Sequence, residues 1–480
     1  MTLDPDDWSG LRTLGHRMVD DMIDHLAEVR SRPVWRPMPA EVRAAFAAGP
    51  PRAGASAESV YDDFTRLILP YGTGNTHPCF TGWVHGGGNA VGMFAELLAA
   101  GLNANLGGRD HAPVEVERQV VRWSAELLGL PAESSGLLVT GTSVANLICV
   151  LVARTAALGP AVRVDGVGRS WLVAYASEKA HSCVARAMDM AGLGTAALRQ
   201  VGVDAAHRID VAALTAAMAH DAARGLTPFL VVGTAGTVDI GAFDDLAAVG
   251  EVARARGAWF HVDAAFGAAA ALSPRWRPLL AGIEAADSVA FDFHKWMQAP
   301  YDCGCVLVRD PAMHQAAFAQ QAAYLRREAR GLAGGHPWPC DLGPDLSRGF
   351  RALKAWMAWR TYGSDRLGEV VDQTCAVARA LAARVDREPE LERLAPAPLN
   401  IVCFRARGDG DLDAQSLDGL NREIVADLQE AGIAAPSTTS IDGRVAIRAA
   451  FVNHRAEIAD ADALADAVLG AARRRLLLTG

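Results

Sequence analysis

Between roughly residues 90 and 310 the chain alternates short apolar runs with amphipathic stretches of helical length, and no other feature constrains its fold as strongly. Each run is short enough for a strand, whereas the stretches between the runs carry apolar residues at the helical period. Strands and helices that alternate in this way form a mainly parallel sheet flanked by helices. The runs are GLLVT, WLVAYA, FLVVGTAGTV, AWFHVDAAFG, SVAFDF and GCVLVR.

The sequences on either side of this region differ from it. Residues up to about 70 show a helical period that proline-rich and small-residue segments interrupt, which indicates an arm without a core of its own. After the alternating region a helix-rich stretch leads to two further strand candidates, LNIVCFRA and GRVAIRAAF. We predict an N-terminal helical arm over residues 1–85, a large α/β domain over 86–360 and a small C-terminal α+β domain over 361–480.

The overall charge argues against two classes of partner. The formal net charge is −9 and no basic run occurs, so the chain lacks the positive field that nucleic acids and anionic membranes attract. No apolar stretch reaches about 18 residues, and the acidic, polar start does not resemble a secretory signal. The eight cysteines follow neither a disulfide framework nor a zinc-site spacing, so we expect reduced thiols, no metal and a cytoplasmic protein.

Lysine is rare in this chain, and its positions mark the candidate nucleophiles. Of the 46 Lys and Arg residues only three are lysines, namely Lys179, Lys295 and Lys354. Arginine stays protonated, whereas the amine of lysine can lose its proton and attack a carbonyl. Lys295 follows the apolar run SVAFDF and stands between His294 and Trp296 in the chain. It is therefore the first candidate for covalent chemistry.

Polar residues follow four of the apolar runs, at the edge of the sheet where open α/β folds bind ligands. Residues 141–143 (Gly-Thr-Ser) turn a strand into a helix and offer backbone N–H groups and hydroxyls to a phosphate. His181 follows WLVAYA, Asp263 ends an almost wholly apolar run, and Lys295 follows SVAFDF. Each feature also has an ordinary structural explanation: a helix cap, a structural histidine, and a salt bridge between Asp263 and Lys295.

Together these residues fit one ligand, pyridoxal 5'-phosphate. The ligand needs a phosphate seat, a group that stacks on its ring, an acid for its pyridine nitrogen and an amine for its aldehyde. In this interpretation Lys295 forms the internal aldimine, Asp263 keeps the pyridine nitrogen protonated and His181 stacks on the ring. Residues 141–143 hold the phosphate.

The segment around Lys295 resembles the attachment motif of the group II pyridoxal-phosphate decarboxylases, which include aromatic amino acid, histidine, tyrosine and glutamate decarboxylases. The motif positions are filled by Ser288, Val289, Lys295, Trp296, Met297, Tyr301, Cys303, Val306 and Arg309. HVDAA, GTV and the arm segment MVDDMIDHLAEVRSRPVW also resemble the family. The resemblance implies a fold type I enzyme with a mainly parallel seven-stranded type of sheet, and a homodimer with shared active sites.

The resemblance also assigns cofactor contacts residue by residue. It implies that Thr237 lies near the ring and Ala265 beneath it. The expected catalytic residues are Lys295, His181 and Asp263. The full set of expected cofactor ligands is Gly141, Thr142, Ser143, His181, Thr237, Asp263, Ala265, His294 and Lys295.

Three segments depart from the aromatic amino acid decarboxylases. Those enzymes line the substrate site with a Pro-Thr pair and apolar residues, where this chain has GWVHGGGNAVG and LNANLGGRDHAP. In the second segment Arg109 can receive a substrate carboxylate or form an internal ion pair. The loop that usually presents a tyrosine has none between residues 326 and 350, and the aligned position falls near Gly335 or His336. The substrate-contact candidates are His85, Gly86, Asn105 and His336.

We therefore expect α-decarboxylation of an L-amino acid to an amine and CO2 through a quinonoid intermediate, and the sequence leaves open whether that amino acid is aromatic. A decarboxylation-dependent aldehyde synthase, in which oxygen intercepts the carbanion, is the second interpretation. An aminotransferase or another lyase of the same fold is the third. The alternative to an enzyme is a catalytically inactive protein of the same fold type that acts in binding or assembly.

Overall fold

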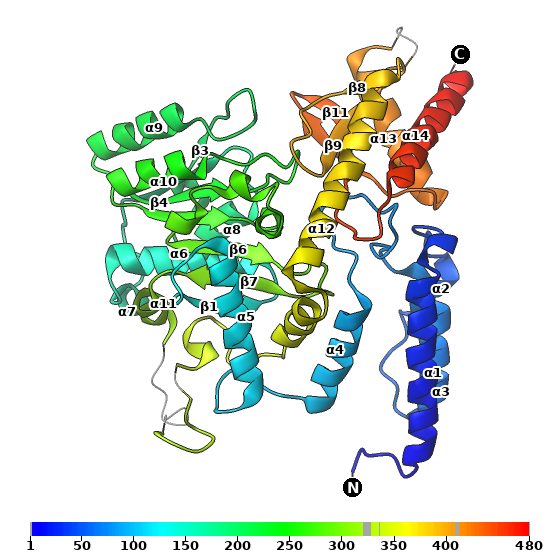
Figure 1. The fold of residues 1–480 in the computed structure, drawn as a ribbon, viewed down its shortest axis with the longest axis horizontal. Coiled ribbons are helices and arrows are strands. Elements are labelled where there is room, and N and C mark those ends of the chain that lie inside the picture. Colours follow the sequence, from blue (N-terminus) through cyan, green and yellow to red (C-terminus); the bar gives the residue numbers. More distant parts are fainter. Residues whose placement is uncertain (1, 320–327, 336, 409–411, 480) are drawn as a thin grey trace.

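The computed structural model describes residues 2–319, 328–335, 337–408 and 412–479 (Figure 1). It contains a seven-stranded sheet and a four-stranded sheet. The long helix α12 (Ala352–Arg387) runs between the parts of the chain that contain them. Within the described residues no helix is both long and apolar enough to cross a membrane.

The large sheet is built from the apolar runs of the alternating region. Its strands are β1 (Ser135–Val139), β2 (Leu172–Ser177), β3 (Leu198–Val201), β4 (Thr227–Thr234), β5 (Trp259–Asp263), β6 (Ser288–Asp292) and β7 (Gly304–Val308). Their order is β1-β7-β6-β5-β4-β2-β3, and only β7 runs antiparallel to its neighbours. The expected mainly parallel, seven-stranded sheet is confirmed.

Both faces of this sheet are covered by helices, which explains why its strands are apolar throughout rather than alternating. In β2, Val173 and Tyr175 pack on one helical layer, whereas Ala174 and Ala176 pack on the other. The first layer contains α5 (Ala112–Leu128), α9 (Val211–Ala223) and α10 (Leu246–Ala255). The second contains α6 (Thr142–Leu158), α8 (Cys183–Met190) and α11 (Pro311–Phe318), and the short α7 (Val162–Asp165) follows α6.

The N-terminal region is helical, as expected. It contains α1 (Trp8–Ala27), α2 (Ala40–Ala45), α3 (Ala57–Asp63), a π-helical turn (Phe64–Ile68) and α4 (Ala90–Leu102). None of the α1 side chains is buried. Polar contacts hold α1 to the α3 region, among them the Tyr61 hydroxyl, which donates to Asp21 at 2.7 Å. In Figure 1 α1, α2 and α3 lie to one side of the molecule, away from the large sheet, and α4 lies between them and the large domain.

The C-terminal region contains the second sheet. Its strands are β8 (Leu391–Arg393), β9 (Ile401–Ala406), β10 (Ser437–Ile441) and β11 (Arg444–Ala450), all antiparallel in the order β10-β11-β9-β8. Helices α13 (Ala414–Glu430) and α14 (Ile458–Thr479) pack against it. The predicted boundary between residues 360 and 361 falls inside α12, close to Gly363, whose φ of 71° interrupts the helix. The three domain ranges stay a prediction.

The direction of the strands defines one functional edge of the large sheet. Because β1, β2, β4, β5 and β6 all point the same way, their carboxyl ends meet at this edge. Short 3-10 helices complete the described fold: Val29–Ser31, Leu69–Tyr71, Thr195–Ala197, Gly267–Leu272, Arg277–Leu280, Ile283–Ala285 and Pro339–Asp341.

Candidate active site

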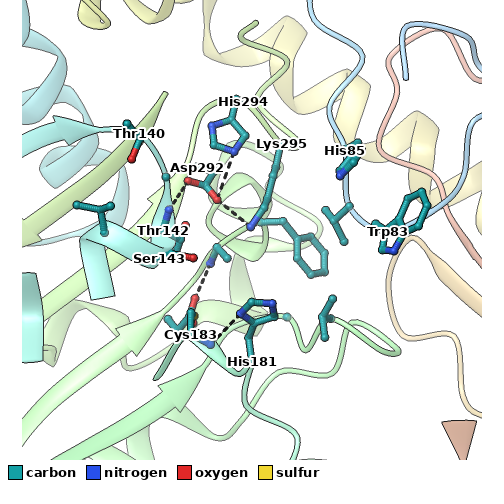
Figure 2. A pocket seen from close by; sticks show the side chains of 18 of the residues that line it. Trp83, His85, Thr140, Thr142, Ser143, His181, Cys183, Asp292, His294 and Lys295 are labelled. Atoms are coloured by element: carbon teal, nitrogen blue, oxygen red, sulfur yellow. Dashed lines mark hydrogen bonds and ion pairs between the residues drawn. The ribbon is translucent and has the colours of Figure 1, made fainter. Parts of the chain in front are cut away.

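A cavity of about 510 Å³ lies at the edge where these strands end (Figure 2). The loops that follow the strands form most of its wall, so residues far apart in the sequence meet here. Every expected cofactor ligand except Thr237 lines the cavity: Gly141, Thr142, Ser143, His181, Asp263, Ala265, His294 and Lys295. The substrate candidate His85 lines it as well.

The phosphate seat, residues 141–143, lies where β1 ends and α6 begins. Thr142 Oγ1 is buried and has no hydrogen-bond partner among the described residues. Ser143 is exposed to the cavity beside it. An unmatched buried hydroxyl at a helix N-terminus is a site that an anion with several acceptor oxygens satisfies. The seat therefore fits a phosphate group.

His294 adds a third donor next to this seat. The backbone N–H of Cys303 donates to His294 Nδ1 at 3.0 Å. Burial lowers the pKa of His294, so the ring is neutral and carries its hydrogen on Nε2. Nε2 lies 3.7 Å from Asp292 Oδ2, on the cavity side of the ring.

Lys295 pairs with Asp292, a residue that the sequence did not single out. Lys295 Nζ lies 2.8 Å from Asp292 Oδ2, and the carboxylate side chain is only 2% exposed. The backbone N–H of Thr142 donates to the other carboxylate oxygen at 2.7 Å. Burial opposes the charge of the amine, but the field and hydrogen bond of Asp292 outweigh it and raise the pKa of Lys295. A charged residue inside SVAFDF was the available signal for Asp292.

Asp263 ends β5 in a well-defined orientation. It is 4% exposed, and its oxygens accept hydrogen bonds from Asn146 Nδ2 at 2.8 Å and from the Ala265 backbone N–H at 3.1 Å. The Cys183 thiol also lies 3.9 Å from Asp263 Oδ2. These donors, joined by one from a ligand in the cavity, would offset the cost of burying the carboxylate. Its position suits the protonated nitrogen of a heterocyclic ring.

His181 lies on the loop between β2 and α8 and is exposed to the cavity. The Cys183 backbone N–H donates to His181 Nδ1 at 3.2 Å, which fixes the ring and leaves Nε2 free to face a ligand. The His181 ring thus enters the cavity from the end of β2, whereas Asp263 and Lys295 enter it from the ends of β5 and β6.

The cavity wall near β4 differs from the expectation for Thr237. Thr237 Oγ1 accepts the Ala242 backbone N–H at 3.0 Å, in a turn behind the wall. Thr234 and Gly236 line the cavity instead, and Thr234 Oγ1 is a second buried hydroxyl without a partner in the described part of the chain. The turn after β4 reverses within these residues, so the sequence alone did not tell which threonine faces inward.

An aromatic wall, formed by Trp83 and His85, lies across the cavity from Thr142 and Ser143 in the view of Figure 2. The His85 ring stacks on Phe80 and on Trp83, each with a centroid distance of 5.6 Å. Burial and the nearby Lys295 lower the pKa of His85, so its imidazole is neutral. Within the described residues its ring nitrogens have no hydrogen-bond partner.

Gly86 packs against the cofactor side of the site rather than lining the cavity. A Cβ at this position would lie 2.3 Å from the carbonyl oxygens of His294 and Lys295. No side chain fits there. The glycine is therefore required for the chain to pass close behind Lys295.

Two other candidates, Asn105 and Arg109, do not line the cavity. Asn105 Oδ1 accepts the backbone N–H groups of Gly107 and Arg348, at 2.9 and 3.0 Å, so it orders a turn. Arg109 lies over the Trp338 ring, with its guanidinium carbon 4.5 Å from the centroid. His336 lies outside the described residues.

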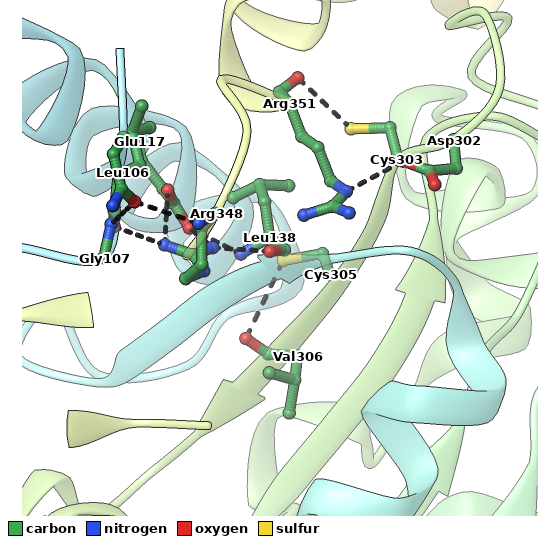
Figure 3. Close-up of polar contacts among 11 residues, drawn as sticks. Leu106, Gly107, Glu117, Leu138, Asp302, Cys303, Cys305, Val306, Arg348 and Arg351 are labelled. Carbon is green, nitrogen blue, oxygen red and sulfur yellow. Dashed lines mark hydrogen bonds and ion pairs between the residues drawn. The ribbon is translucent and has the colours of Figure 1, made fainter. Parts of the chain in front are cut away.

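A buried ion pair fixes the segment that returns to the large domain before α12 (Figure 3). Arg348 Nη1 donates to Glu117 Oε2 and to the Leu106 carbonyl, both at 3.0 Å. The same carboxylate accepts the Leu138 backbone N–H at 2.8 Å. The two charged side chains are 1% and 4% exposed. The pair thereby joins β1, α5 and the segment around residue 348.

Substituting Glu117 with glutamine should lower the free energy of unfolding by about 3–5 kcal/mol, because Arg348 would keep a buried charge without a counter-ion. Denaturant titration of the purified protein measures the change. Glu133→Gln, at an exposed position, is the matched control and should alter stability by less than about 0.5 kcal/mol. Equal stability of the two variants would show that the pair contributes nothing.

The donors in this cavity fit pyridoxal phosphate: a helix N-terminus with unmatched hydroxyls, a buried carboxylate and a lysine amine. Among the described residues no group of His, Cys, Asp and Glu side chains could hold a metal ion.

Comparison with known proteins supports the same cofactor. Residues 39–407 match the family model described as the pyridoxal-dependent decarboxylase conserved domain. The chain is 31% identical over 450 residues to aromatic-L-amino-acid decarboxylase of Bacillus atrophaeus, covering 93% of this chain and 92% of that protein. It is 29% identical over 467 residues to phenylacetaldehyde synthase of Arabidopsis thaliana, covering 94% and 93%. The crystal structure of Oryza sativa TDC with PLP and tryptamine superimposes with a TM-score of 0.90 at 28% identity, over 99% of this chain and 100% of that one.

Proposed function

The chain belongs to the family of pyridoxal-dependent decarboxylases, and from this membership we propose how the residues around the cavity divide the work. It is a pyridoxal-phosphate-dependent carboxy-lyase that decarboxylates an amino acid. When bound, pyridoxal phosphate supplies an electron sink for the pair that remains after CO2 leaves. The proposed assignments rest on one observation: Lys295, Asp263 and the phosphate seat line the same cavity.

Lys295 is the residue that we assign to the cofactor aldehyde. Its amine must lose a proton before it can react, and Asp292 Oδ2 at 2.8 Å is placed to accept that proton. The same carboxylate holds the Thr142 backbone N–H, so it also keeps the lysine close to the phosphate seat. Asp292 thereby joins the set of residues with a proposed role in catalysis.

The remaining assignments concern binding of the cofactor. Asp263 would hold the proton of the pyridine nitrogen, His181 would stack on the ring, and Ala265 would lie against it. The phosphate would receive hydrogen bonds from the hydroxyls of Thr142 and Ser143 and from His294 Nε2. Such charge-assisted hydrogen bonds contribute about 1.5–3 kcal/mol each. Thr237, behind the wall, would act through the turn that carries Thr234.

An aromatic L-amino acid is the substrate that we propose. The aromatic wall of Trp83 and His85 offers flat faces to a second ring, and such contacts contribute about 0.5–1.5 kcal/mol beyond burial. The neutral imidazole of His85 offers a hydrogen bond to a polar ring substituent. The named activity of the Bacillus atrophaeus relative and the tryptamine bound to Oryza sativa TDC support this class.

Release of CO2 from L-tryptophan, L-tyrosine, L-phenylalanine, L-histidine and L-glutamate tests the proposal. We expect kcat/KM to be at least about tenfold higher for one of the first three, and His85→Ala to lower it about tenfold or more. His220→Ala, on the exposed face of α9, is the control. If glutamate is the best substrate, the aromatic assignment is wrong although the decarboxylase remains.

The product is expected to be mainly amine, with a measurable aldehyde fraction in air that disappears under nitrogen. The stretch 326–350 has no tyrosine to deliver a proton to the α-carbon, so His181 or His336 would deliver it more slowly and oxygen could compete. Oxygen would then be reduced to hydrogen peroxide while aldehyde, ammonia and CO2 form. Quantifying amine and aldehyde under both atmospheres measures the ratio.

Two outcomes would change this interpretation. If aldehyde and ammonia dominate in air, the chain is an aldehyde synthase, as one of its relatives is named. If wild type gives only amine and His336→Ala leaves rate and ratio unchanged, the loop histidine has no role in protonation.

A homodimer with shared active sites is the assembly that we propose. Helix α1 buries no side chain, and Trp8, Leu11 and Ile23 on it are exposed. On α4, Leu97 and Leu98 are 57% and 55% exposed. Apolar helix faces of this kind are covered when a second copy packs on them.

Removal of residues 1–70 should therefore give aggregated or cofactor-poor protein, because the surface that the arm covers in the dimer becomes exposed. Light scattering and cofactor absorbance measure the effect. Leu97→Asp and Leu98→Asp keep every helix and should weaken the dimer as well. A truncated monomer with full activity would contradict the proposal.

We also place the protein in the cytoplasm, because the seven cysteines other than Cys340 are thiols in the described part of the structure. Fractionation of cells that produce the chain should recover it there with reduced thiols; recovery in an oxidised, exported form would contradict this location.

A further inference from the structure

A continuous line of hydrogen bonds leads from Asp263 away from the cavity. Asn146 Nδ2 lies 2.8 Å from Asp263 Oδ2, and Asn146 Oδ1 lies 2.8 Å from His261 Nε2. His261 Nδ1 lies 2.9 Å from Ser288 Oγ, which lies 2.8 Å from Trp259 Nε1. We call Asn146, His261, Ser288 and Trp259 the Asp263 relay.

Asn146, His261 and Ser288 are buried, Trp259 is partly buried, and none of the four lines the cavity. Asn146 and His261 are 1% exposed and Ser288 is fully buried. Polar side chains in such a position are costly unless each donor meets an acceptor. The proposed mechanism gives them no task, so their presence requires another explanation.

With Asp263 ionised and the His261 ring neutral, one arrangement of hydrogens satisfies the side-chain line, although the Ser288 carbonyl oxygen, 3.2 Å from His261 Nδ1, would also accept a hydrogen from that nitrogen. An ionised Asp263 accepts hydrogen bonds and cannot donate, so Asn146 must turn its N–H groups towards it and its oxygen towards His261. His261 must then carry its hydrogen on Nε2, which leaves Nδ1 to accept from the Ser288 hydroxyl. Ser288 Oγ accepts from the indole N–H of Trp259, which is a donor only.

The surroundings keep the relay neutral. Burial lowers the pKa of His261 to about 4, so its ring is uncharged at neutral pH. Burial also raises the pKa of the adjacent Cys149 and Cys183 thiols to about 12 each. Asp263 is therefore the charged side chain that the relay contacts in the described part of this core.

We propose that Asn146 and His261 are positioning residues that keep the Asp263 carboxylate ionised and aimed at the cavity. This inference rests on the proposed role of Asp263 towards the pyridine nitrogen. Asn146 supplies the donor. His261 prevents the Asn146 amide from rotating by half a turn, which would place an oxygen against the carboxylate and favour its protonated form.

The first test measures the His261 tautomer in the wild-type protein and uses one variant for assignment. In protein labelled with ¹⁵N-histidine, the His261 ring should show the neutral form with hydrogen on Nε2, unchanged between about pH 6 and 9. Comparison with His261→Gln assigns its resonances among the 13 histidines. A ring protonated on Nδ1, or on both nitrogens, would overturn the proposal.

The second test follows the pyridine nitrogen itself, with ring-¹⁵N-labelled pyridoxal phosphate bound to each variant. Asn146→Asp puts two carboxylates in contact, so one must take a proton, and His261→Leu frees the amide to rotate. Both should lower the protonated fraction of the ring nitrogen and reduce kcat about 10–100-fold, the usual cost of losing a supporting hydrogen bond of this type. His261→Gln keeps a donor near the Nε2 position and should stay close to wild type.

Controls separate this inference from the proposed function. Asn421→Asp, at a fully buried amide that accepts the Ala406 N–H, should change stability but not the nitrogen signal. If Asp263→Asn changes the signal and both Asn146→Asp and His261→Leu do not, the relay has no positioning role and the role of Asp263 stands. If Asp263→Asn also leaves the signal unchanged, the proposed role of Asp263 is wrong. Should the variants fail to fold, the wild-type tautomer still decides.

Discussion

Lys295→Arg is expected to abolish the covalent attachment of the cofactor and to lower the rate of CO2 release by about 10²–10⁴-fold or more. Arginine keeps the positive charge beside Asp292, so the buried carboxylate stays paired and the fold is retained. Its guanidinium does not lose a proton and cannot attack an aldehyde. The rate falls because both the nucleophile and a positioned proton-transfer group are lost.

Borohydride reduction of the holoenzyme followed by peptide mapping is the measurement. Wild type should carry the reduced cofactor on the peptide that contains Lys295, and the variant should carry none. Lys179→Ala is the matched control, since this lysine does not line the cavity. Label on Lys179 or Lys354, or normal turnover of Lys295→Arg, would refute the assignment.

Asp263→Asn should retain much of the cofactor binding and lose about 10²–10³-fold in kcat. The amide has nearly the shape of the carboxylate, so the contact with the ring side of the cavity remains. Its charge is gone, and without an anion at this position the pyridine nitrogen loses the partner that keeps it protonated. Removing one preorganised electrostatic contact to a reacting system costs a factor of this size.

Titration of cofactor absorbance and steady-state kinetics separate the two effects of Asp263→Asn. Asp221→Asn is the control, because Asp221 is an equally buried carboxylate that contacts Tyr175 and Arg199 on the far part of the sheet. Near-normal turnover of Asp263→Asn would show that the carboxylate is not needed for the electron sink.

The strands that could be read from the sequence are those that the fold buries on both faces. β2 and β4 to β7 are continuous apolar runs, and so they stand out against amphipathic helices. β3 has the mixed sequence LRQV at the edge of the sheet, and β8 and β10 are partly exposed, so their sequences resemble loops. Burial on one face, or at an edge, leaves too weak a pattern to recognise.

The site was predictable to the extent that its chemistry needs particular residue types. A lysine after a strand, an acid at the end of another strand and a Gly-Thr-Ser turn before a helix are each visible without a structure. Asp292 was missed because a lone acid in an apolar run has many explanations. Asn105 was selected because its segment stands where the family lines the substrate site, but its amide oxygen is used by the backbone of a turn.

The sequence by itself determined the sheet architecture and the class of cofactor, and it singled out Lys295 as the proposed reactive amine, because these depend on periodicity and on functional groups that no other residue supplies. Only the tertiary structure decided which groups touch Lys295 and Asp263. Asp292 reaches Thr142 because β7 places the ends of β1 and β6 on the same edge, and Asn146 reaches Asp263 because α6 packs across β5. Such contacts depend on strand order and helix packing, which bring together residues more than a hundred positions apart.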